Sequence, residues 1–309
     1  TLHEEGRFLL DDPVSKYIPA FKNPRVFVRY DSATGRAETR PAKSEITIRQ
    51  LLSHTAGIPY EHPLSGQPAY EVPFFASTKR ETLAEAIPKL AARPLMADPG
   101  EKYVYGLNTD ILGYLIEVLS GKSLDIFIKQ RVLDPLGMTE THFYLSQEKT
   151  GRLVELYSKA APADRLAVHA NDTYRSFAVS GARTYFSGGA GLVSTIEDYA
   201  KFCQMLLNRG VFNGKRILSG KTVDMMTRNQ IGELEVWDRQ DKFGLGFQVV
   251  TPNSHYGDQA SVGAYTWGGM YCSEYTIDPA EQQVMLVFTN VQPYAHYSEF
   301  VRTFRTLVY

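Results

Sequence analysis

The chain has 309 residues, a formal net charge of −1 at pH 7 and a hydrophobic content of 43%. This composition is typical of a folded globular protein and gives no reason to expect nucleic acid or an anionic membrane surface as a partner. No run of about 18 apolar residues is present, so no membrane-spanning helix is predicted. The two cysteines, Cys203 and Cys272, match no C-x-x-C pattern, which argues against a disulfide framework and a zinc ribbon.

The first predicted element, in chain order, is the end of a helix. Leu2, Glu4 and Glu5 have the pattern of a last turn, and Gly6 occupies the position where a left-handed cap usually falls. Nothing before Thr1 supplies an N-cap or a first turn. We therefore expect this helix to start upstream of the printed sequence.

Helices are predicted through the middle of the chain from apolar stripes and caps. A capping box, Thr47 with Gln50, opens a short helical turn, and residues 60 to 78 are predicted to form a long loop. Further helices are "NTDILGYLIEVLSG", stopped by Gly121, a second helix capped by Ser123, and "STIEDYAKFCQMLLNRG", with Ser194 and Glu197 as its capping box.

The pattern changes after about residue 230. The segment "FGLGFQVV" alternates apolar residues and predicts one strand, and "YTWGGMYCSEYTI" and "QQVMLVFTN" predict two more around the turn "DPAE". An amphipathic helix, "SEFVRTFRTLVY", ends the chain. We therefore predict an α/β protein of the α+β type, with a mainly helical region with long loops at 1–230 and antiparallel strands plus a C-terminal helix at 231–309.

Four stretches carry the chemistry: "LLSHTAGIPY", "PGEKYVYGLNTDILGYLIEVLSG", "SGGAGLVSTIEDYAKF" and "YTWGGMYCSEYTIDPAEQQVMLVFTN". In this order and spacing the chain resembles the serine β-lactamase-like hydrolases, from about Leu2 to Tyr309. It is most similar to family VIII carboxylesterases, which are related to class C β-lactamases and D-Ala-D-Ala carboxypeptidases. The resemblance implies a β-lactamase/transpeptidase-like fold, a helical region packed on an antiparallel sheet. It also implies ester hydrolysis through an acyl-enzyme, with no metal or cofactor.

The resemblance assigns roles to particular residues. Tyr105 falls at the catalytic tyrosine, and Trp267, Gly268 and Gly269 fall at the strand-edge triplet that lines the substrate pocket. Met270 would then donate its backbone N–H to the oxyanion hole. Tyr60 is placed at the pocket mouth. We expect the Tyr105 hydroxyl and the Met270 amide to face one cleft.

Each assignment has a plainer alternative. Tyr105 can be an ordinary half-buried tyrosine, and Trp267 can be a core tryptophan beside a β-bulge. Tyr60 can be an aromatic residue of a loop. His54 is a candidate general base, but the resemblance implies a structural role for the "SHTAG" turn that contains it. These alternatives stay open at the level of sequence.

The family nucleophile motif, S-x-x-K, has one literal match, Ser146 to Lys149, in a segment predicted to be a surface loop. Family spacing instead places the motif upstream of Thr1, so we expect the nucleophilic Ser and its Lys to be absent from this chain. The chain by itself is then predicted to be inactive.

Two departures from the β-lactamase pattern concern the substrate. Trp267 stands where β-lactamases carry Lys, and Leu107 stands where an Asn would grip an acylamino side chain. Both favour small uncharged esters over penicillins. The alternatives are a β-lactamase or D-Ala-D-Ala peptidase, an acyltransferase, and a non-catalytic ligand-binding member or inactive truncation. The predicted partner is a small-molecule ester. The oligomeric state and compartment are left open, with the cytoplasm slightly favoured.

Overall fold

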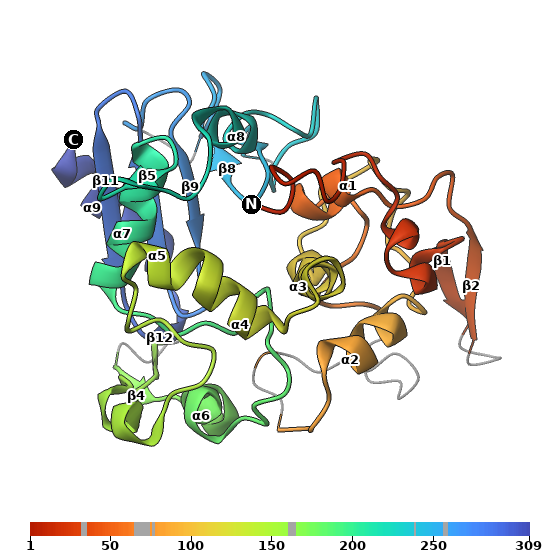
Figure 1. Ribbon diagram of the computed structural model, residues 1–309, viewed down its shortest axis with the longest axis horizontal. Helices are drawn as coiled ribbons and strands as arrows, with labels where there is room; N and C mark the ends of the chain where they lie inside the picture. Colours follow the sequence, from red (N-terminus) through yellow and green to blue (C-terminus); the bar gives the residue numbers. More distant parts are fainter. Residues whose placement is uncertain (32–35, 65–74, 76–77, 160–164, 238, 256–258) are drawn as a thin grey trace. The chain divides into compact units, whose positions relative to one another are not determined.

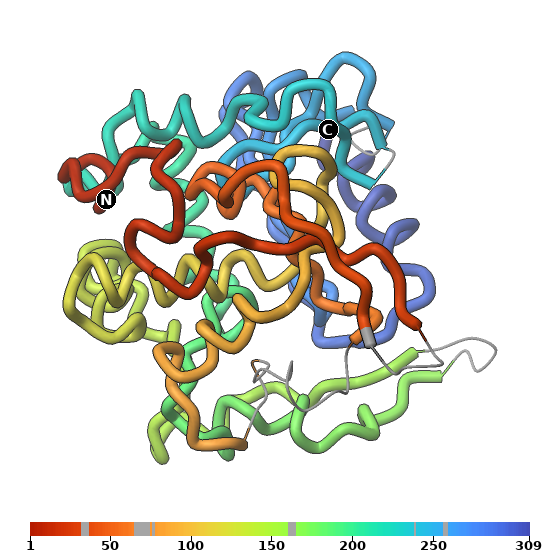
Figure 2. The backbone as a smooth tube through the Cα atoms, turned by 90° about the vertical axis from the view of Figure 1, so that its right-hand side faces the viewer, coloured from red at the N-terminus to blue at the C-terminus, as the bar shows by residue number. Residues whose placement is uncertain are grey.

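The computed structural model describes residues 1–31, 36–64, 75, 78–159, 165–237, 239–255 and 259–309, which can be followed along the chain in Figure 2. Most of the predicted loop at 60–78 lies outside the described residues. The chain forms two compact units, each assembled from separate segments. The first contains Thr1–Gln130, Ala182–Gly191 and Gln230–Leu234, and the second contains Arg131–Gly181, Leu192–Asn229 and Glu235–Tyr309. The predicted division at residue 230 follows helix and strand content, whereas these units interleave across it.

The first unit is built from short helices and one β-hairpin (Figure 1). Its elements are η1 (Val14–Lys16), η2 (Pro19–Phe21), β1 (Arg25–Asp31), β2 (Arg36–Pro41), α1 (Ile48–Leu52), α2 (Leu83–Leu90), α3 (Asn108–Ser120) and α4 (Leu124–Ile128). Strands β1 and β2 pair antiparallel. Helix α3 is the centre of this unit because α1, α2 and α4 all contact it. Ile111 and Leu115 of its apolar stripe are buried.

Two of the predicted glycine caps are present in this unit, one after the turn at residues 2–6 and one at the end of α3. Gly6 has a φ of 69°. Its N–H donates to the His3 carbonyl at 2.9 Å, and the Arg7 N–H donates to the Leu2 carbonyl at 3.1 Å. This pair of bonds is a Schellman motif, which satisfies carbonyls that a helix end leaves without partners. Gly121, also at a φ of 69°, ends α3. Both predicted caps are confirmed.

The predicted N-caps are confirmed in one case and wrong in another. Thr47 and Gln50 form the full capping box at the start of α1. The helix predicted to be capped by Ser194 begins one residue later, because the Thr195 side chain accepts the N–H of Asp198. The Ser194 hydroxyl instead bonds to the side chain of Thr141 at 2.7 Å.

In the described residues, the second unit contains a three-stranded sheet (β12-β3-β4), a two-stranded hairpin (β5-β6), one larger sheet and most of the longer helices. The helical segments are η4 (Lys129–Leu133), which leads into the unit, α5 (Asp134–Leu136), η5 (Gln147–Arg152), α6 (Asp172–Ser180), α7 (Ile196–Leu207), α8 (Gly220–Met226) and α9 (Tyr297–Val308). The strands outside the larger sheet are β3 (Tyr157–Lys159), β4 (Ala167–Val168), β5 (Val211–Phe212), β6 (Lys215–Arg216) and β12 (Val291–Tyr294). In the described part of the chain, no helix combines the length and apolar character of a membrane span.

The larger sheet is antiparallel, with strand order β11-β10-β9-β8-β7. Its strands are β7 (Lys242–Phe243), β8 (Gln248–Val249), β9 (Tyr265–Gly268), β10 (Ser273–Asp278) and β11 (Gln283–Phe288). Two of the predicted strands are each two strands joined by a tight turn. The segment "FGLGFQVV" turns at Gly246, whose φ is 97°, and "YTWGGMYCSEYTI" turns after Gly268. Both predictions were wrong because an alternating pattern continues on both arms of a hairpin.

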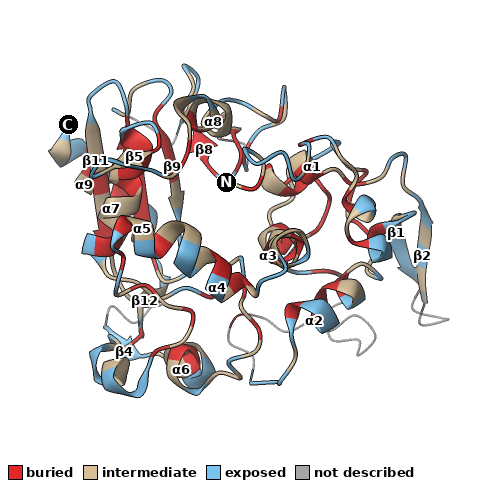
Figure 3. Ribbon diagram, in the orientation of Figure 1, coloured by how far each residue is buried: buried red, intermediate tan, exposed pale blue. Residues whose placement is uncertain are grey.

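Helices cover both faces of this sheet. Tyr275 of β10 packs against Tyr199 of α7, with ring centroids 5.3 Å apart. The adjacent residue, Glu274, forms a buried ion pair with Arg305 of α9 at 2.6 Å. Because successive side chains on a strand point to opposite faces, α7 and α9 lie on opposite faces of the sheet (Figure 1). Figure 3 shows the buried positions along α7 and the strands that it covers.

Candidate active site

Tyr105 and Tyr60 meet in the first unit. Tyr105 lies directly before α3, Tyr60 ends the "HTAGIPY" segment, and their rings pack edge to face with centroids 5.3 Å apart. Both side chains are partly buried. Burial raises the pKa of the Tyr60 phenol, and Tyr105 and Asp110 raise it further. Tyr60 is therefore a neutral hydroxyl at physiological pH, placed beside the proposed catalytic phenol.

A glycine makes this meeting possible. A Cβ atom at Gly106 would lie 2.1 Å from the carbonyl oxygen of Ile58 and 2.4 Å from the carbonyl carbon of Pro59. No side chain fits at such a distance, so only glycine lets the two backbone segments touch. The contact carries Tyr60 to the side of Tyr105. The tyrosine and the glycine of "YGL" therefore work as one structural element.

His54 and Asn108 form the packing behind Tyr105. His54 is buried, and its ring centroid lies 4.7 Å from that of Tyr105. The Asn108 amide Nδ2–H groups donate to His54 Nδ1 at 2.9 Å and to the Ile58 carbonyl at 3.2 Å. Burial lowers the pKa of His54 to about 3, so the imidazole is neutral at physiological pH. This geometry supports a structural role for His54.

Asp110 is a further polar group of this cluster, and the sequence analysis missed it. The side chain is 1% exposed, and Oδ1 accepts from Ser187 Oγ at 2.7 Å and from the Tyr185 hydroxyl at 3.2 Å. Burial raises its pKa. A Cβ at Gly189 would lie 2.7 Å from Asp110 Oδ2 and 3.0 Å from the Tyr60 hydroxyl. Asp110 therefore ties α3 to the "SGG" segment beside Tyr60. The sequence signal that could have identified Asp110 is an acidic residue directly before Ile111, a residue of the apolar stripe of a predicted core helix.

The strand-edge triplet lies in the second unit, at the end of β9. Strand β8 pairs with Tyr265 and Thr266 only, so in the described chain residues 267 and 268 have a strand partner on the β10 side alone. The Gly269 N–H donates to the Ser273 carbonyl on β10 at 2.8 Å. Backbone groups alternate in direction along a strand, so the N–H and C=O of Gly268 point to the open side.

Met270 lies in the exposed turn that follows. Its side chain is 39% exposed, and its N–H has no acceptor among the residues that the structure describes. The turn closes with the Cys272 N–H donating to the Gly269 carbonyl at 3.0 Å. A Cβ at Gly269 would lie 2.5 Å from Ser273 Oγ. Within the described part of the chain, the hairpin thus presents a short edge of open backbone followed by an N–H donor without an acceptor.

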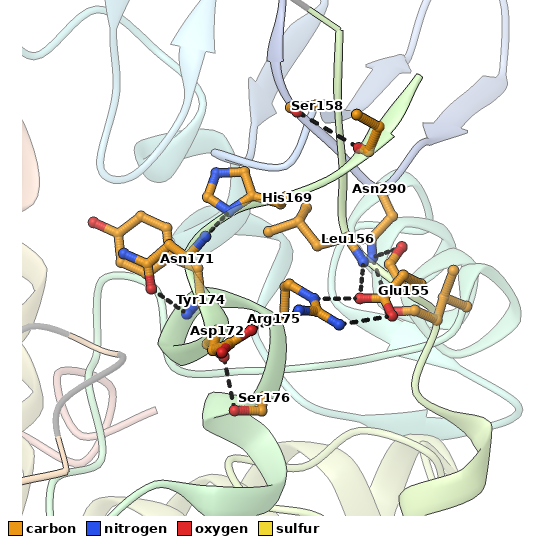
Figure 4. Close-up of polar contacts among 12 residues, drawn as sticks. Glu155, Leu156, Ser158, His169, Asn171, Asp172, Tyr174, Arg175, Ser176 and Asn290 are labelled. Atoms are coloured by element: carbon orange, nitrogen blue, oxygen red, sulfur yellow. Dashed lines mark hydrogen bonds and ion pairs between the residues drawn. The ribbon is translucent and has the colours of Figure 1, made fainter. Parts of the chain in front are cut away.

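The hairpin is braced from outside the sheet. The Tyr271 hydroxyl donates to the Tyr174 carbonyl of α6 at 2.8 Å. Helix α6 is held in turn by two bonds from Arg175 to the Glu155 carboxylate, at 2.7 Å and 3.1 Å (Figure 4). The Asn290 amide donates to the Glu155 carbonyl at 2.9 Å. The Tyr271 bond thus ties the exposed turn to α6, and the Arg175 bonds tie α6 to Glu155.

The sequence comparisons identify the protein family. The sequence model of the Beta-lactamase family matches residues 1–309. The chain belongs to the Beta-lactamase family. Its helices and antiparallel sheets are the β-lactamase/transpeptidase-like fold, so the predicted fold class is confirmed.

Relatives in this family include hydrolases and acyltransferases. An uncharacterised protein of Mycobacterium tuberculosis is 31% identical over 301 residues, which covers 93% of this chain and 72% of the relative. Monacolin J acid methylbutanoyltransferase of Aspergillus terreus is 28% identical over 343 residues, covering 99% of this chain and 77% of the relative. The solved structure of EstCE1, a hydrolase with promiscuous acyltransferase activity, is 26% identical with a TM-score of 0.75, covering 98% of this chain and 79% of that chain.

The literal S-x-x-K of this family member does not have the setting of a nucleophile. Ser146 is exposed and lies at the start of the short 3-10 helix η5, where its side chain makes no capping bond. The Lys149 ammonium donates to the Thr139 carbonyl at 2.7 Å and to Glu140 at 3.1 Å. The lysine is therefore engaged in a surface ion pair. The structure supports the interpretation of this match as a surface segment.

Proposed function

We propose that this protein is a serine hydrolase of carboxylic esters that works through an acyl-enzyme. The observation that carries the proposal is the backbone edge at Gly268, which among the described residues has no strand partner on one side and is followed by a Met270 N–H without an acceptor. Such an edge can receive the carbonyl group of an ester without a side-chain obstacle, and the N–H can stabilise the oxyanion. Membership of the Beta-lactamase family supports the same reaction class.

Tyr105 is proposed to transfer the proton. A phenol with its reference pKa of about 10 is a weak base at neutral pH, and a neighbouring ammonium group makes it effective by favouring the phenolate. The Lys of an S-x-x-K motif would supply that charge, and its Ser would attack the acyl carbon. That this motif lies upstream of Thr1 stays a prediction. Tyr60 is proposed to line the pocket mouth beside Tyr105.

The triplet is proposed to favour uncharged esters. Trp267 presents an aromatic side chain where a β-lactamase presents Lys, so an anionic β-lactam carboxylate gains no ion pair from this position. Its ring packs with that of Trp237, with centroids 5.4 Å apart, and with that of Phe243 at 5.1 Å. An apolar group therefore finds an apolar surface beside the strand edge.

Acyl transfer to an alcohol is a second candidate function. It is favoured by the similarity to the Aspergillus terreus methylbutanoyltransferase and to EstCE1, whose names record acyl transfer. The two reactions share the acyl-enzyme and differ only in whether water or an alcohol removes the acyl group. The same residues are therefore proposed for both.

The test uses the complete protein and a short-chain p-nitrophenyl ester. Tyr105→Phe is expected to lower kcat by about 10²–10⁴-fold, the usual contribution of a general acid–base group. Tyr157→Phe, which changes an exposed tyrosine on β3, serves as the matched control. A Tyr105→Phe variant with the parent rate would refute the assigned role, and complete protein without ester turnover would favour the non-catalytic alternative.

Two further measurements separate the enzyme alternatives. Nitrocefin is expected to be a much poorer substrate than the ester, and faster nitrocefin cleavage would indicate a β-lactamase. An added alcohol that yields a new ester at the expense of free acid would identify acyl transfer. The product ratio, followed by chromatography, distinguishes that reaction from simple hydrolysis.

A further inference from the structure

Trp237 is an exposed tryptophan in a strained backbone. Its side chain is 46% exposed and its φ is 48°, a region that bulky residues rarely adopt. The turn is anchored on both sides of it. Val236 is fully buried, its N–H donates to the Asp241 carbonyl at 3.2 Å, and the Arg239 N–H donates to the Val236 carbonyl at 3.1 Å. The fold thus holds a large apolar side chain outward at a cost in backbone strain.

The indole of Trp237 continues an aromatic series that begins in the core. Phe243 is 1% exposed and packs edge-on against Trp267, at an interplanar angle of 86°. Trp267 stacks in turn on Trp237, with an interplanar angle of 26°. The Arg239 guanidinium lies 5.1 Å from the Trp237 ring centroid and further restrains it. Trp237 is therefore a preorganised ring beside a residue of the strand-edge triplet.

We propose that Trp237 is a specificity-determining residue that selects esters carrying a flat aromatic group. The inference rests on the proposed function, because Trp267 immediately precedes the open backbone edge at Gly268. Stacked indole rings offer a rigid planar apolar surface, on which another planar ring packs better than an aliphatic chain of similar size. The recognised group belongs to either the acyl or the alcohol part of the ester.

The first experiment needs no catalysis. The chain contains two tryptophans, Trp237 and Trp267, so fluorescence excited at a wavelength that tryptophan absorbs and tyrosine does not reports on this stack. Titration of the 309-residue chain with p-nitrobenzyl alcohol, a flat quencher, is expected to give saturable quenching. Trp237→Leu, which still contains Trp267 as a reporter, is expected to bind about 5- to 10-fold more weakly. Trp237→Tyr, which keeps an aromatic face, is expected to recover part of the affinity.

Phe300→Leu is the matched control, because Phe300 of α9 is a similarly exposed aromatic residue of the same unit, 40% exposed. Its affinity for the quencher is expected to equal that of the parent. Quenching that rises linearly without saturation in the parent chain, or equal affinity in Trp237→Leu, overturns the inference even if ester hydrolysis is found. If no ester hydrolysis is found but the quencher still binds saturably and depends on Trp237, only the proposed function is overturned.

The second experiment identifies which part of the ester is recognised. For the complete protein, kcat/KM is measured for p-nitrophenyl benzoate against p-nitrophenyl cyclohexanecarboxylate, and for phenyl acetate against ethyl acetate. Comparison of parent and variant cancels the intrinsic reactivity of each ester. Trp237→Leu is expected to lower one of the two aromatic-to-aliphatic ratios of kcat/KM about 5-fold. A lower benzoate-to-cyclohexanecarboxylate ratio indicates recognition of the acyl part, and a lower phenyl-to-ethyl acetate ratio indicates recognition of the alcohol part. Both ratios unchanged would overturn the inference.

Discussion

The two groups of proposed site residues are built on opposite principles. Around Tyr105, in the first unit, the backbone is closed: Gly106 touches a carbonyl oxygen, and His54, Asn108 and Asp110 are buried and hydrogen-bonded. Around Gly268, in the second unit, the backbone is open, and Met270 is 39% exposed. A proton-transferring phenol must be held in one place, whereas an edge that receives substrate must leave its backbone groups accessible.

The glycines show the same difference. A Cβ at Gly106 would meet fixed backbone atoms, while a Cβ at Gly269 would meet the hydroxyl of Ser273, which can rotate away. Gly106 is therefore required for close packing of the backbone, whereas Gly269 leaves the backbone of the proposed site accessible to substrate. Substitutions at the two positions should separate these roles.

At neutral pH, the largest effect is expected for Gly106→Ala. Because its Cβ would lie 2.1 Å from the Ile58 oxygen, the backbone must shift, and we expect a loss of about 3 kcal/mol in the free energy of unfolding. Gly151→Ala is the control, since a Cβ there meets no atom within 4 Å. Urea unfolding of both variants measures the difference. Equal stability of the two would mean that the contact of Gly106 is not tightly packed.

The next effect is expected at Asp110. Asp110→Ala removes the acceptor of the buried Ser187 and Tyr185 hydroxyls, for a loss of about 2 kcal/mol. Asp110→Asn keeps an acceptor oxygen and carries no charge. Because burial raises the pKa of Asp110, the parent loses stability as pH rises from 3.8 through the native value, and the Asn variant does not.

Thermal unfolding across this pH range tests the prediction for Asp110. The stability of Asp110→Asn relative to the parent should increase with pH and then level off. A constant difference at all pH values would show that the carboxyl group does not titrate differently in the native state.

A pH-dependent loss of stability is expected from His54. Its pKa falls from 6.5 to about 3 on burial, so the unfolded state takes up a proton that the native state excludes. This contribution to stability is complete above pH 6.5 and is lost as pH falls, at about 1.4 kcal/mol per pH unit, until the native pKa is reached. The free energy of unfolding is measured against pH for the parent and for His54→Gln, which lacks the titrating group. His296→Gln, at an exposed position, is the control. Parallel curves for all three proteins would contradict it.

The smallest effect is expected for Gly269→Ala, with a loss below about 1 kcal/mol, because Ser273 Oγ can rotate out of the way. The loss should shrink further in a Ser273→Ala background, since the two positions are in contact. A double-mutant cycle on unfolding free energies measures the coupling. Independent losses at the two positions would show that Ser273 is not the constraint.

Much of the local structure could be predicted from the sequence. The cap at Gly6, the capping box of Thr47 and Gln50, and the end of α3 at Gly121 all depend on bonds between residues a few positions apart. Tyr105 was likewise correctly placed just before a helix. The errors at Ser194 and in the two hairpins concern boundaries, where neighbouring residues offer nearly equivalent caps and turns.

The contacts that make a site were decided by tertiary packing. The meeting of Tyr60 with Tyr105, the anchoring of Asp110 by Ser187, and the stacking of Trp237 on Trp267 each join residues far apart in the chain. No periodicity or short motif specifies such pairs, because the distance between distant segments depends on how whole helices and strands pack. The family motifs predict which segments carry the chemistry, and close packing of glycine and aromatic residues determined what each segment contacts.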